Sequence, residues 1–308
     1  MKFKRWMAMA TAAVLAIGTL AGCAQGEKKA DTTAASSAES SAAASGKKLK
    51  IVATIFPEYD WVRQILGDEA KNADITLLLD KGVDLHSYQP NAEDIAKISE
   101  CDLFVLAVKP QVMKEALVPV KPLLKKGGAA LSIAAGIEGS VLSGWLGGYP
   151  VIRAMPNTPA LVGAGLSGLW VPEGTSPEHA EAAEFVMRAV GNVVACKTEA
   201  ELDVVGAIPG SGPAYVFRFL EALERAAQKR GFTPEDAREL AIGTVFGAAK
   251  LARESEESFA TLRERVTSKG GTTARALAVM NERDIDGMMD DAVEAALRRT
   301  AEMKALFR

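Results

Sequence analysis

Cysteine, histidine and aromatic residues are scarce in this 308-residue chain, and their scarcity excludes several kinds of site. Only Cys23, Cys101 and Cys196 carry thiols, and no two of them have metal-ligand spacing or suggest a disulfide framework. The two histidines, His86 and His179, fall short of the roughly four ligands of a zinc site. The net charge of −3 gives no reason to expect a nucleic-acid partner. Hydrophobic residues still make up 48% of the chain, enough for one large domain or two ordinary ones.

The first 23 residues have the pattern of an export signal. Basic side chains precede residue 6, an apolar run extends from Trp6 to about Leu20, and the tetrapeptide Leu-Ala-Gly-Cys ends at Cys23. The run is short for a membrane span, which favours a signal peptide over residues 1–23. Its ending resembles a bacterial lipoprotein cleavage box, which implies a lipid anchor on Cys23 and a membrane-anchored protein. An apolar core helix is the alternative.

Residues 24–47 contain almost no large apolar side chains and are rich in Ala, Ser, Thr and Lys. Such a composition cannot form a core, so we predict a disordered linker. Folded structure is expected to begin near Lys48.

Alternating strand and helix patterns follow the linker. Apolar, β-branched runs predict strands at Leu49–Thr54, Ile75–Leu79 and Asp102–Val108. Helical spacing predicts helices at Pro57–Leu66 and Asn91–Ile98. The order β-α-β-α-β predicts a parallel sheet.

Two segments of this region resemble a zinc- or manganese-uptake solute-binding lipoprotein. They are Ala53–Tyr59 and Asp84–Pro90, and His86 matches the first metal ligand of that family. The resemblance covers residues 1–104. No metal site is expected here, because the other histidine, His179, lies at what looks like an exposed helix start. His86 is then an isolated remnant ligand or an ordinary loop histidine.

The rest of the chain predicts two more strands and then helices only. Leu131–Ala134 and Val151–Met155 have strand patterns. Tyr215–Lys229 has an amphipathic helical pattern, and Thr233 caps a second helix over about Pro234–Ala252. That second helix is rich in Gly and Ala, so we expect it to be buried at a subunit interface.

Thr267–Thr273 combines glycines and hydroxyls directly before a predicted helix at Ala274–Met280. Free N–H groups and a partial positive charge at a helix N-terminus suit an anion such as a small carboxylate. A plain helix cap is the competing interpretation, because Ser and Thr cap many helices.

Five motifs, in this order and spacing, resemble pyrroline-5-carboxylate reductase over residues 105–308. Any one of them alone is weak, but together they are specific. They are Leu106–Gln111, Ser132–Ile137, Val151–Pro159, Gly210–Tyr215 and Thr267–Thr273.

The resemblance implies a fold and an activity. The fold is an α/β Rossmann-like N-terminal domain followed by an all-α dimerisation domain. Residues 48–104 and 105–200 would share one hybrid parallel sheet, and residues 201–308 would form the helical domain. The activity is NAD(P)H-dependent reduction of 1-pyrroline-5-carboxylate to L-proline by a cytoplasmic homodimer or higher homo-oligomer, with NADP or NAD as cofactor.

The resemblance also implies site residues. Thr273 is the catalytic candidate, as hydrogen-bond partner of the ring nitrogen. The substrate would meet Glu199, Ser268, Thr272 and Thr273. The cofactor would meet Val108, Lys109, Ala135 and Asn157.

The chain departs from the family where the cofactor's pyrophosphate would bind. Members carry a Gly-rich turn after the first strand, whereas Ile55–Asp60 contains no glycine and two acids. A G-x-G-x-x-G match at Gly163–Gly168 is rejected, because a strand pattern follows it. We therefore predict loss of most cofactor affinity. Pro209 and Lys269 also replace residues more usual in the family, and Pro209 is expected to alter its turn.

Three hypotheses remain open: a reductase impaired in cofactor binding, a metal-uptake lipoprotein fragment, and an inactive chimera. The segment that resembles the lipoprotein and the segment that resembles the reductase join within Cys101–Val108.

Overall fold

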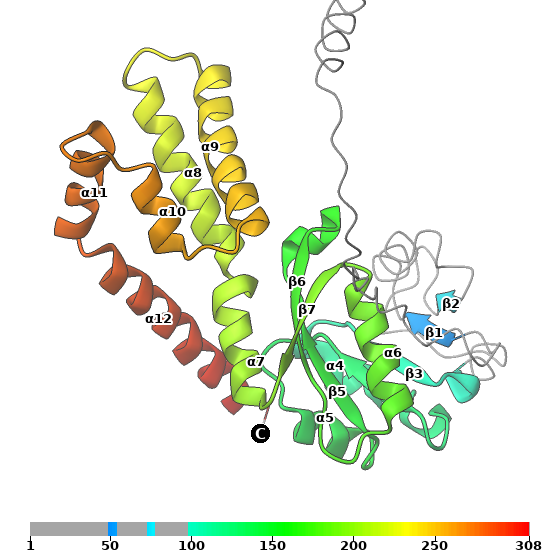
Figure 1. The fold of residues 1–308 in the computed structure, drawn as a ribbon. Helices are drawn as coiled ribbons and strands as arrows, with labels where there is room; N and C mark the ends of the chain where they lie inside the picture. The colour runs from blue at the N-terminus through cyan, green and yellow to red at the C-terminus, as the bar shows by residue number, and fades with distance from the viewer. Residues whose placement is uncertain (1–48, 54–72, 78–97, 308) are drawn as a thin grey trace, which may run out of the picture. The chain divides into compact units, whose positions relative to one another are not determined.

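A seven-stranded sheet precedes the helical C-terminal region in the described chain (Figure 1). The computed structural model describes residues 49–53, 73–77 and 98–307. Within them the strand order is β2-β1-β3-β4-β5-β6-β7. The strands are β1 (Leu49–Ala53), β2 (Ala73–Leu77), β3 (Leu103–Leu106), β4 (Ala129–Ser132), β5 (Val151–Met155), β6 (Gly165–Trp170) and β7 (Gly191–Cys196).

The sheet is parallel except where β5 meets β6. Antiparallel pairing there sets Arg153 opposite Trp170, while β6 and β7 are again parallel. The chain moves from β1 outward to β2 and then back past β1 to β3. The gap between β1 and β3 is therefore the topological switch point, where open α/β sheets bind ligands. The expected parallel, Rossmann-like sheet is confirmed, with one antiparallel pair added.

Helices cover both faces of the sheet. They are α4 (Pro110–Leu117), α5 (Gly139–Trp145), α6 (Pro177–Arg188) and α7 (Glu199–Val205), with short 3-10 turns η3 (Lys121–Leu123) and η4 (Thr158–Val162). On one face, α6 packs Ala183 and Met187 against Leu103 and Ile152. On the other, α4 and α5 pack against Phe104 and Leu106. Alternate residues of β3 thus enter two different cores, which explains its unbroken apolar sequence.

The remaining elements are helical. They are the π-helical turn η5 (Gly206–Gly210), α8 (Gly212–Gln228), α9 (Pro234–Glu254), α10 (Phe259–Arg265), α11 (Thr272–Glu282) and α12 (Ile285–Ala305). Helices α8 and α9 run side by side (Figure 1). The all-α C-terminal region is confirmed.

Helix α9 exposes most of its small-residue face in the single chain. Thr233 caps it as expected, accepting a hydrogen bond from Asp236 N at 3.1 Å. Only Ala237 and Ala241 of this helix are buried, whereas Gly243 and Gly247 are exposed. Within the described residues of a single chain, nothing covers that small-residue face.

Strand and turn positions differ from expectation in detail. β5 matches its prediction, β3 is shorter by three residues than Asp102–Val108, and β4 lies two residues earlier than Leu131–Ala134. Gly163 ends η4 in the left-handed region, and Gly165 and Gly168 lie inside β6, so no helix follows that motif. Its rejection as a dinucleotide fingerprint is confirmed.

The turn around Pro209 is π-helical. Pro209 lies inside η5, where it has no N–H to donate. Ser211 N instead donates to Gly206 O at 3.0 Å, five residues earlier, and this wider turn links α7 to α8.

The C-terminal end of α12 contacts the α/β part. Lys304 pairs with Asp203 of α7 at 2.5 Å, and Phe307 meets Trp145 of α5 edge-on at 6.5 Å between ring centroids. Gly136 lies under Met303: a Cβ there would fall 2.9 Å from that of Met303. Among the helices described, none has the length and hydrophobicity to cross a membrane. The predicted signal, linker, glycine-free turn and His86 fall outside the described residues, as do the helix Pro57–Leu66 and most of Asn91–Ile98.

Candidate active site

The four residues expected near the cofactor follow neighbouring strands. Val108 and Lys109 come after β3, Ala135 follows β4, and Asn157 follows β5. These strands are parallel, so their carboxyl ends lie at one edge of the sheet, beside the β1–β3 switch point. The topology thus places residues that are far apart in sequence, from Val108 to Asn157, at the same edge of the sheet.

The start of α4 has the properties of an anion site. Lys109 is its N-cap residue, Pro110 occupies the first turn, and no side chain caps the helix. The exposed Lys109 side chain adds a positive charge to the positive end of the helix dipole. These residues fit the anionic part of a dinucleotide. The turn after β1, which would complete such a site, lies outside the described residues.

The loop after β4 is held at several points. Ala134 N donates to Ser132 Oγ at 3.3 Å, and Ala134 O accepts from Arg153 Nη2 at 3.3 Å. Gly136 has φ of +74°, which disfavours any other residue, and it packs under Met303. Ala135, between these anchors, is half-buried.

Asn157 uses both ends of its amide on backbone. Its Nδ2 donates to Pro209 O and its Oδ1 accepts from Leu166 N, both at 2.9 Å. Asn157 therefore joins the end of β5 to the turn η5, so its first role in this structure is to fix that junction.

Glu199 lies at the first position of α7 and is also engaged. Its Oε1 accepts from Arg153 Nη1 and from Gly139 N, each at 2.8 Å. The Arg153 side chain is 2% exposed, so this is an ion pair between a buried cation and a half-buried carboxylate. The family resemblance implies a substrate role for Glu199 and gives no role to Arg153. A single arginine within the apolar strand Val151–Met155 is the signal that could have identified it.

The three hydroxyl residues lie at the start of α11. The helix begins at Thr272, two residues before the expected Ala274, so Thr272 and Thr273 have N–H groups in its first turn. Gly271 is the N-cap residue and no side-chain cap is present, so the plain-cap interpretation fails. A side chain on Gly271 would collide with Ser268 Oγ. Thr272 and Ser268 are exposed, and Thr273 is half-buried.

The cofactor-side and substrate-side residues form two separate groups in the chain. Across residues 98–307, no hydrogen bond joins Ser268, Thr272 or Thr273 to the sheet or its loops. Helix α11 contacts α12, whose far end reaches the α/β part.

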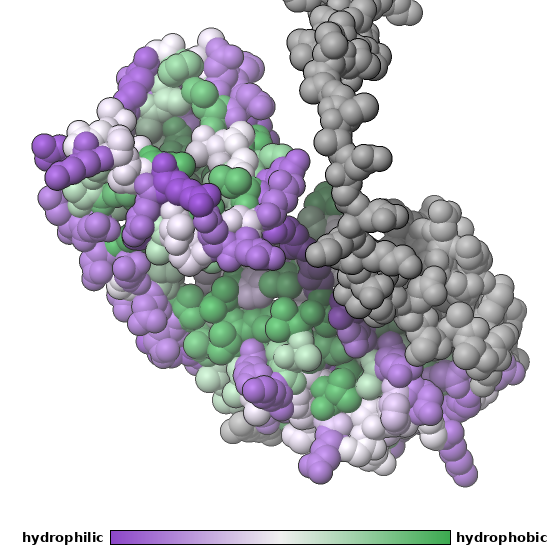
Figure 2. All heavy atoms as spheres, in the orientation of Figure 1, coloured by the Kyte–Doolittle hydropathy of each residue, from purple (hydrophilic) through white to green (hydrophobic). Residues whose placement is uncertain are grey.

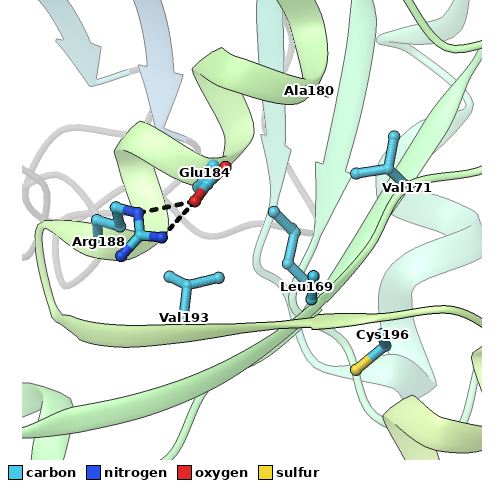
Figure 3. A pocket seen from close by; sticks show the side chains of 8 residues that line it. Leu169, Val171, Ala180, Glu184, Arg188, Val193 and Cys196 are labelled. Carbon is cyan, nitrogen blue, oxygen red and sulfur yellow. Dashed lines mark hydrogen bonds and ion pairs between the residues drawn. The ribbon is translucent and has the colours of Figure 1, made fainter. Parts of the chain in front are cut away.

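A hollow of about 260 Å³ lies elsewhere, between α6 and strands β6 and β7 (Figure 3). Leu169 and Val193 contribute apolar side chains, and Glu184 and Arg188 pair on α6 at its side. Cys196 lines it too, and burial, with a contribution from Glu201, raises the pKa of that thiol. The thiol therefore stays protonated at neutral pH and is a poor nucleophile.

The described part of the chain holds no group of three or more His, Cys, Asp or Glu residues that could bind a metal. His179 lies at the start of α6 as expected, but it is half-buried rather than exposed, and its ring bonds to Ser176 at 3.0 Å.

Comparisons with known proteins match the two parts of the chain to different families. A family model described as pyrroline-5-carboxylate reductase dimerisation matches residues 199–303. A model described as zinc-uptake complex component A, periplasmic, matches residues 51–123.

Whole-protein relatives come from the first of these families. A curated pyrroline-5-carboxylate reductase of Pseudomonas aeruginosa is 41% identical over 216 residues, which is 70% of this chain and 78% of that protein. The Haemophilus influenzae enzyme is 39% identical over 70% of this chain and 80% of that protein. A solved pyrroline-5-carboxylate reductase from Coxiella burnetii superposes with a TM-score of 0.73 at 33% identity, covering 83% of this chain and 99% of that one. By sequence and by fold, this chain belongs to the pyrroline-5-carboxylate reductase family.

Proposed function

We propose that this chain reduces 1-pyrroline-5-carboxylate to L-proline with NADPH or NADH. The observation that supports the proposal is that one chain combines a Rossmann-like switch point with a helix start suited to an anion. Loops at the carboxyl edge of β3, β4 and β5 lie beside the switch point, and an uncapped, glycine-led helix start lies at α11. The relatives named above carry this activity in their names.

On the cofactor side, Lys109 at the start of α4 would attract a phosphate. Val108, Ala135 and Asn157 would line the rest of the edge. The bound nicotinamide supplies the hydride, and the protein supplies orientation and exclusion of water. The choice between NADP and NAD depends on residues after β1 and β2, which lie outside the described part.

On the substrate side, the first turn of α11 would bind the carboxylate. Ser268 and Thr272 add hydroxyl donors to its free N–H groups. Thr273 would hydrogen-bond the ring nitrogen, where charge changes as the C=N bond is reduced. Glu199, expected at the substrate, would reach it only with the oxygen that Arg153 does not use.

The active unit proposed is a homodimer or a higher homo-oligomer. The reductase dimerisation model matches residues 199–303. Many large apolar side chains of α8 and α9 are exposed in the single chain, and Figure 2 shows such side chains at the surface of the helical part. A second copy would cover them and could bring α11 to the other group of residues.

The N-terminal part carries a second candidate function, favoured by the zinc-uptake model at residues 51–123. In that case residues 1–104 derive from a solute-binding lipoprotein, joined to a reductase near Cys101–Val108. A signal cleaved at Cys23 would anchor the chain to a membrane, whereas an unused signal would leave it in the cytoplasm. Zinc binding that His86→Ala abolishes would support a surviving metal function.

The test follows NADPH absorbance on adding pyrroline-5-carboxylate to purified residues 47–308, the compact unit of the chain. We expect substrate-dependent oxidation that Thr273→Ala lowers about 100-fold in kcat/KM, because it removes a donor to the reacting nitrogen. Thr300→Ala is the matched control, since Thr300 Oγ1 donates only within α12, to Ala296 O.

The same protein gives the dissociation constant for NADPH. We expect weak binding, because the turn after β1 lacks glycine. Affinity like that of ordinary reductases would contradict the argument from the missing glycines. A folded dimer without turnover would contradict the proposed activity.

A further inference from the structure

Arg153 is a charged side chain in the middle of the core. It lies on β5 between the fully buried Ile152 and Ala154, and it is itself 2% exposed. Its register neighbours are Ser132 of β4 and Trp170 of β6. A guanidinium cannot lose its charge at ordinary pH, so its place in the core depends on its partners.

Those partners come from two separate segments, and one of them also binds a third. Nη1 donates to Glu199 Oε1 at the start of α7, and Nη2 donates to Ala134 O in the loop after β4. The same Oε1 accepts from Gly139 N at the start of α5. One buried pair therefore joins a loop of the sheet edge to the first turns of two helices.

Stability alone does not explain such a pair. Desolvation of two charges offsets most of their attraction, and apolar residues of similar volume often serve a core as well or better. The Nε of Arg153 also has no hydrogen-bond partner, although it is buried. What a guanidinium does provide is a planar fork that holds two acceptors at a fixed separation.

The two acceptors belong to the two sides of the proposed site. Ala134 directly precedes Ala135, which the proposed function places at the cofactor. Glu199 begins α7, which continues through η5 into the helical region that contains Ser268 and Thr273. Asn157, through Pro209 O, ties η5 to the end of β5 as well.

We propose that Arg153 is a positioning residue. Together with Glu199, it holds the Ala134–Gly136 loop against the starts of α5 and α7. The loop at the cofactor and the helical domain then keep a fixed position relative to each other. Glu199 then acts through Arg153 and Gly139 and not on the substrate. This inference rests on the proposed function for its kinetic consequence, and its structural consequence can be measured without turnover.

The structural test is hydrogen exchange of the full chain without cofactor, in peptides covering 132–140 and 197–206. Arg153→Lys keeps the charge but cannot reach both acceptors, so exchange should rise in both peptides and little elsewhere. Arg188→Lys is the matched control, because Arg188 pairs with Glu184 in an exposed contact on α6. Unchanged exchange in both peptides would overturn the proposal.

The binding test measures the NADPH dissociation constant and, where turnover exists, both KM values. Arg153→Lys should raise the NADPH dissociation constant about tenfold, because one charged hydrogen bond that orients the loop is lost. The KM for pyrroline-5-carboxylate should stay within about twofold of wild type.

Glu199→Gln is the second variant and decides the matter if Arg153→Lys fails to fold. Its retained oxygen can still accept from Gly139 N, but the ion pair is lost, so exchange should rise in the same two peptides. A raised KM for pyrroline-5-carboxylate with unchanged exchange would place Glu199 on the substrate and overturn the proposal. Failure of the proposed reaction would leave the exchange result standing, so the two failures can be told apart.

Discussion

At the scale of single residues, the side chains found from motifs have contacts that the motifs do not reveal. Asn157 was expected near a cofactor, and its amide binds two backbone groups. Glu199 was expected near a substrate, and its Oε1 binds Arg153 and Gly139. The family resemblance identifies these residues by their positions relative to its motifs along the chain. Their bonds depend on segments 9 to 60 residues away, which no local pattern reports.

Tyr149 provides a prediction at this scale. Its hydroxyl donates to Lys125 O at 3.1 Å, and burial raises its pKa to about 12, with additional effects from Cys101 and Asp102. The neutral form is thus favoured by folding. This contribution is complete below pH 10, the usual tyrosine pKa, and is lost as the pH rises through 12.

The measurement is the tyrosinate absorbance of the folded protein between pH 9 and 12. Tyr149→Phe should remove the titration step at the highest pH. The difference in free energy of unfolding between the wild type and Tyr149→Phe should shrink by about 1 kcal/mol over that pH range, after allowance for solvent screening of a half-buried group. If the variant and the wild type titrate alike near pH 12, the burial argument for Tyr149 is wrong.

At the scale of elements, periodicity and turn residues predicted most of what the structure shows. The strand β5 and the helices α8 and α9 lie where the sequence placed them, because their apolar spacing and start signals are strong, and α11 extends two residues beyond its predicted start. β4 lies two residues early, since Ala129 and Ala130 are small and their burial is set by neighbouring strands. The antiparallel entry of β6 could not be predicted, because strand direction depends on pairing and not on composition.

Gly168 tests the packing of α7 against β6. It lies in β6 under α7, and a Cβ there would meet Leu202 Cδ1 and Val205 Cγ2, both at 2.9 Å. Gly168→Ala should push α7 from the sheet and lower the free energy of unfolding by about 1–3 kcal/mol. Chemical denaturation measures this, with Gly144→Ala as control.

Gly144 lies in α5 with open space around its Cβ position, so alanine there should be neutral or stabilising by up to about 1 kcal/mol. Equal stability of the two variants would show that α7 does not depend on the small residue at 168.

At the scale of the whole molecule, the described residues form a buried core in the α/β part and leave much of the apolar surface of the helical part exposed. Helix α8 has no buried residue, and α9 has two. The sequence did indicate an interface on α9, through its glycines and alanines. It could not show which apolar residues a single chain leaves uncovered, because that depends on the packing of every neighbouring element.

Phe246 of α9 is the sharpest test of that surface, being 67% exposed in the single chain. If a second copy covers it, Phe246→Glu should weaken self-association at least about 30-fold while leaving the folded chain intact, since a buried charge without a partner opposes the contact. Val118→Glu, at a 69% exposed position after α4, is the control for adding a charge at an exposed apolar site. Sedimentation mass as a function of concentration distinguishes them: dissociation of both variants would indicate a general charge effect, and dissociation of neither would place the interface elsewhere. Loss of association by Phe246→Glu alone, with turnover lost in parallel, would show that α9 forms the interface and that the two halves of the site act only in the assembly.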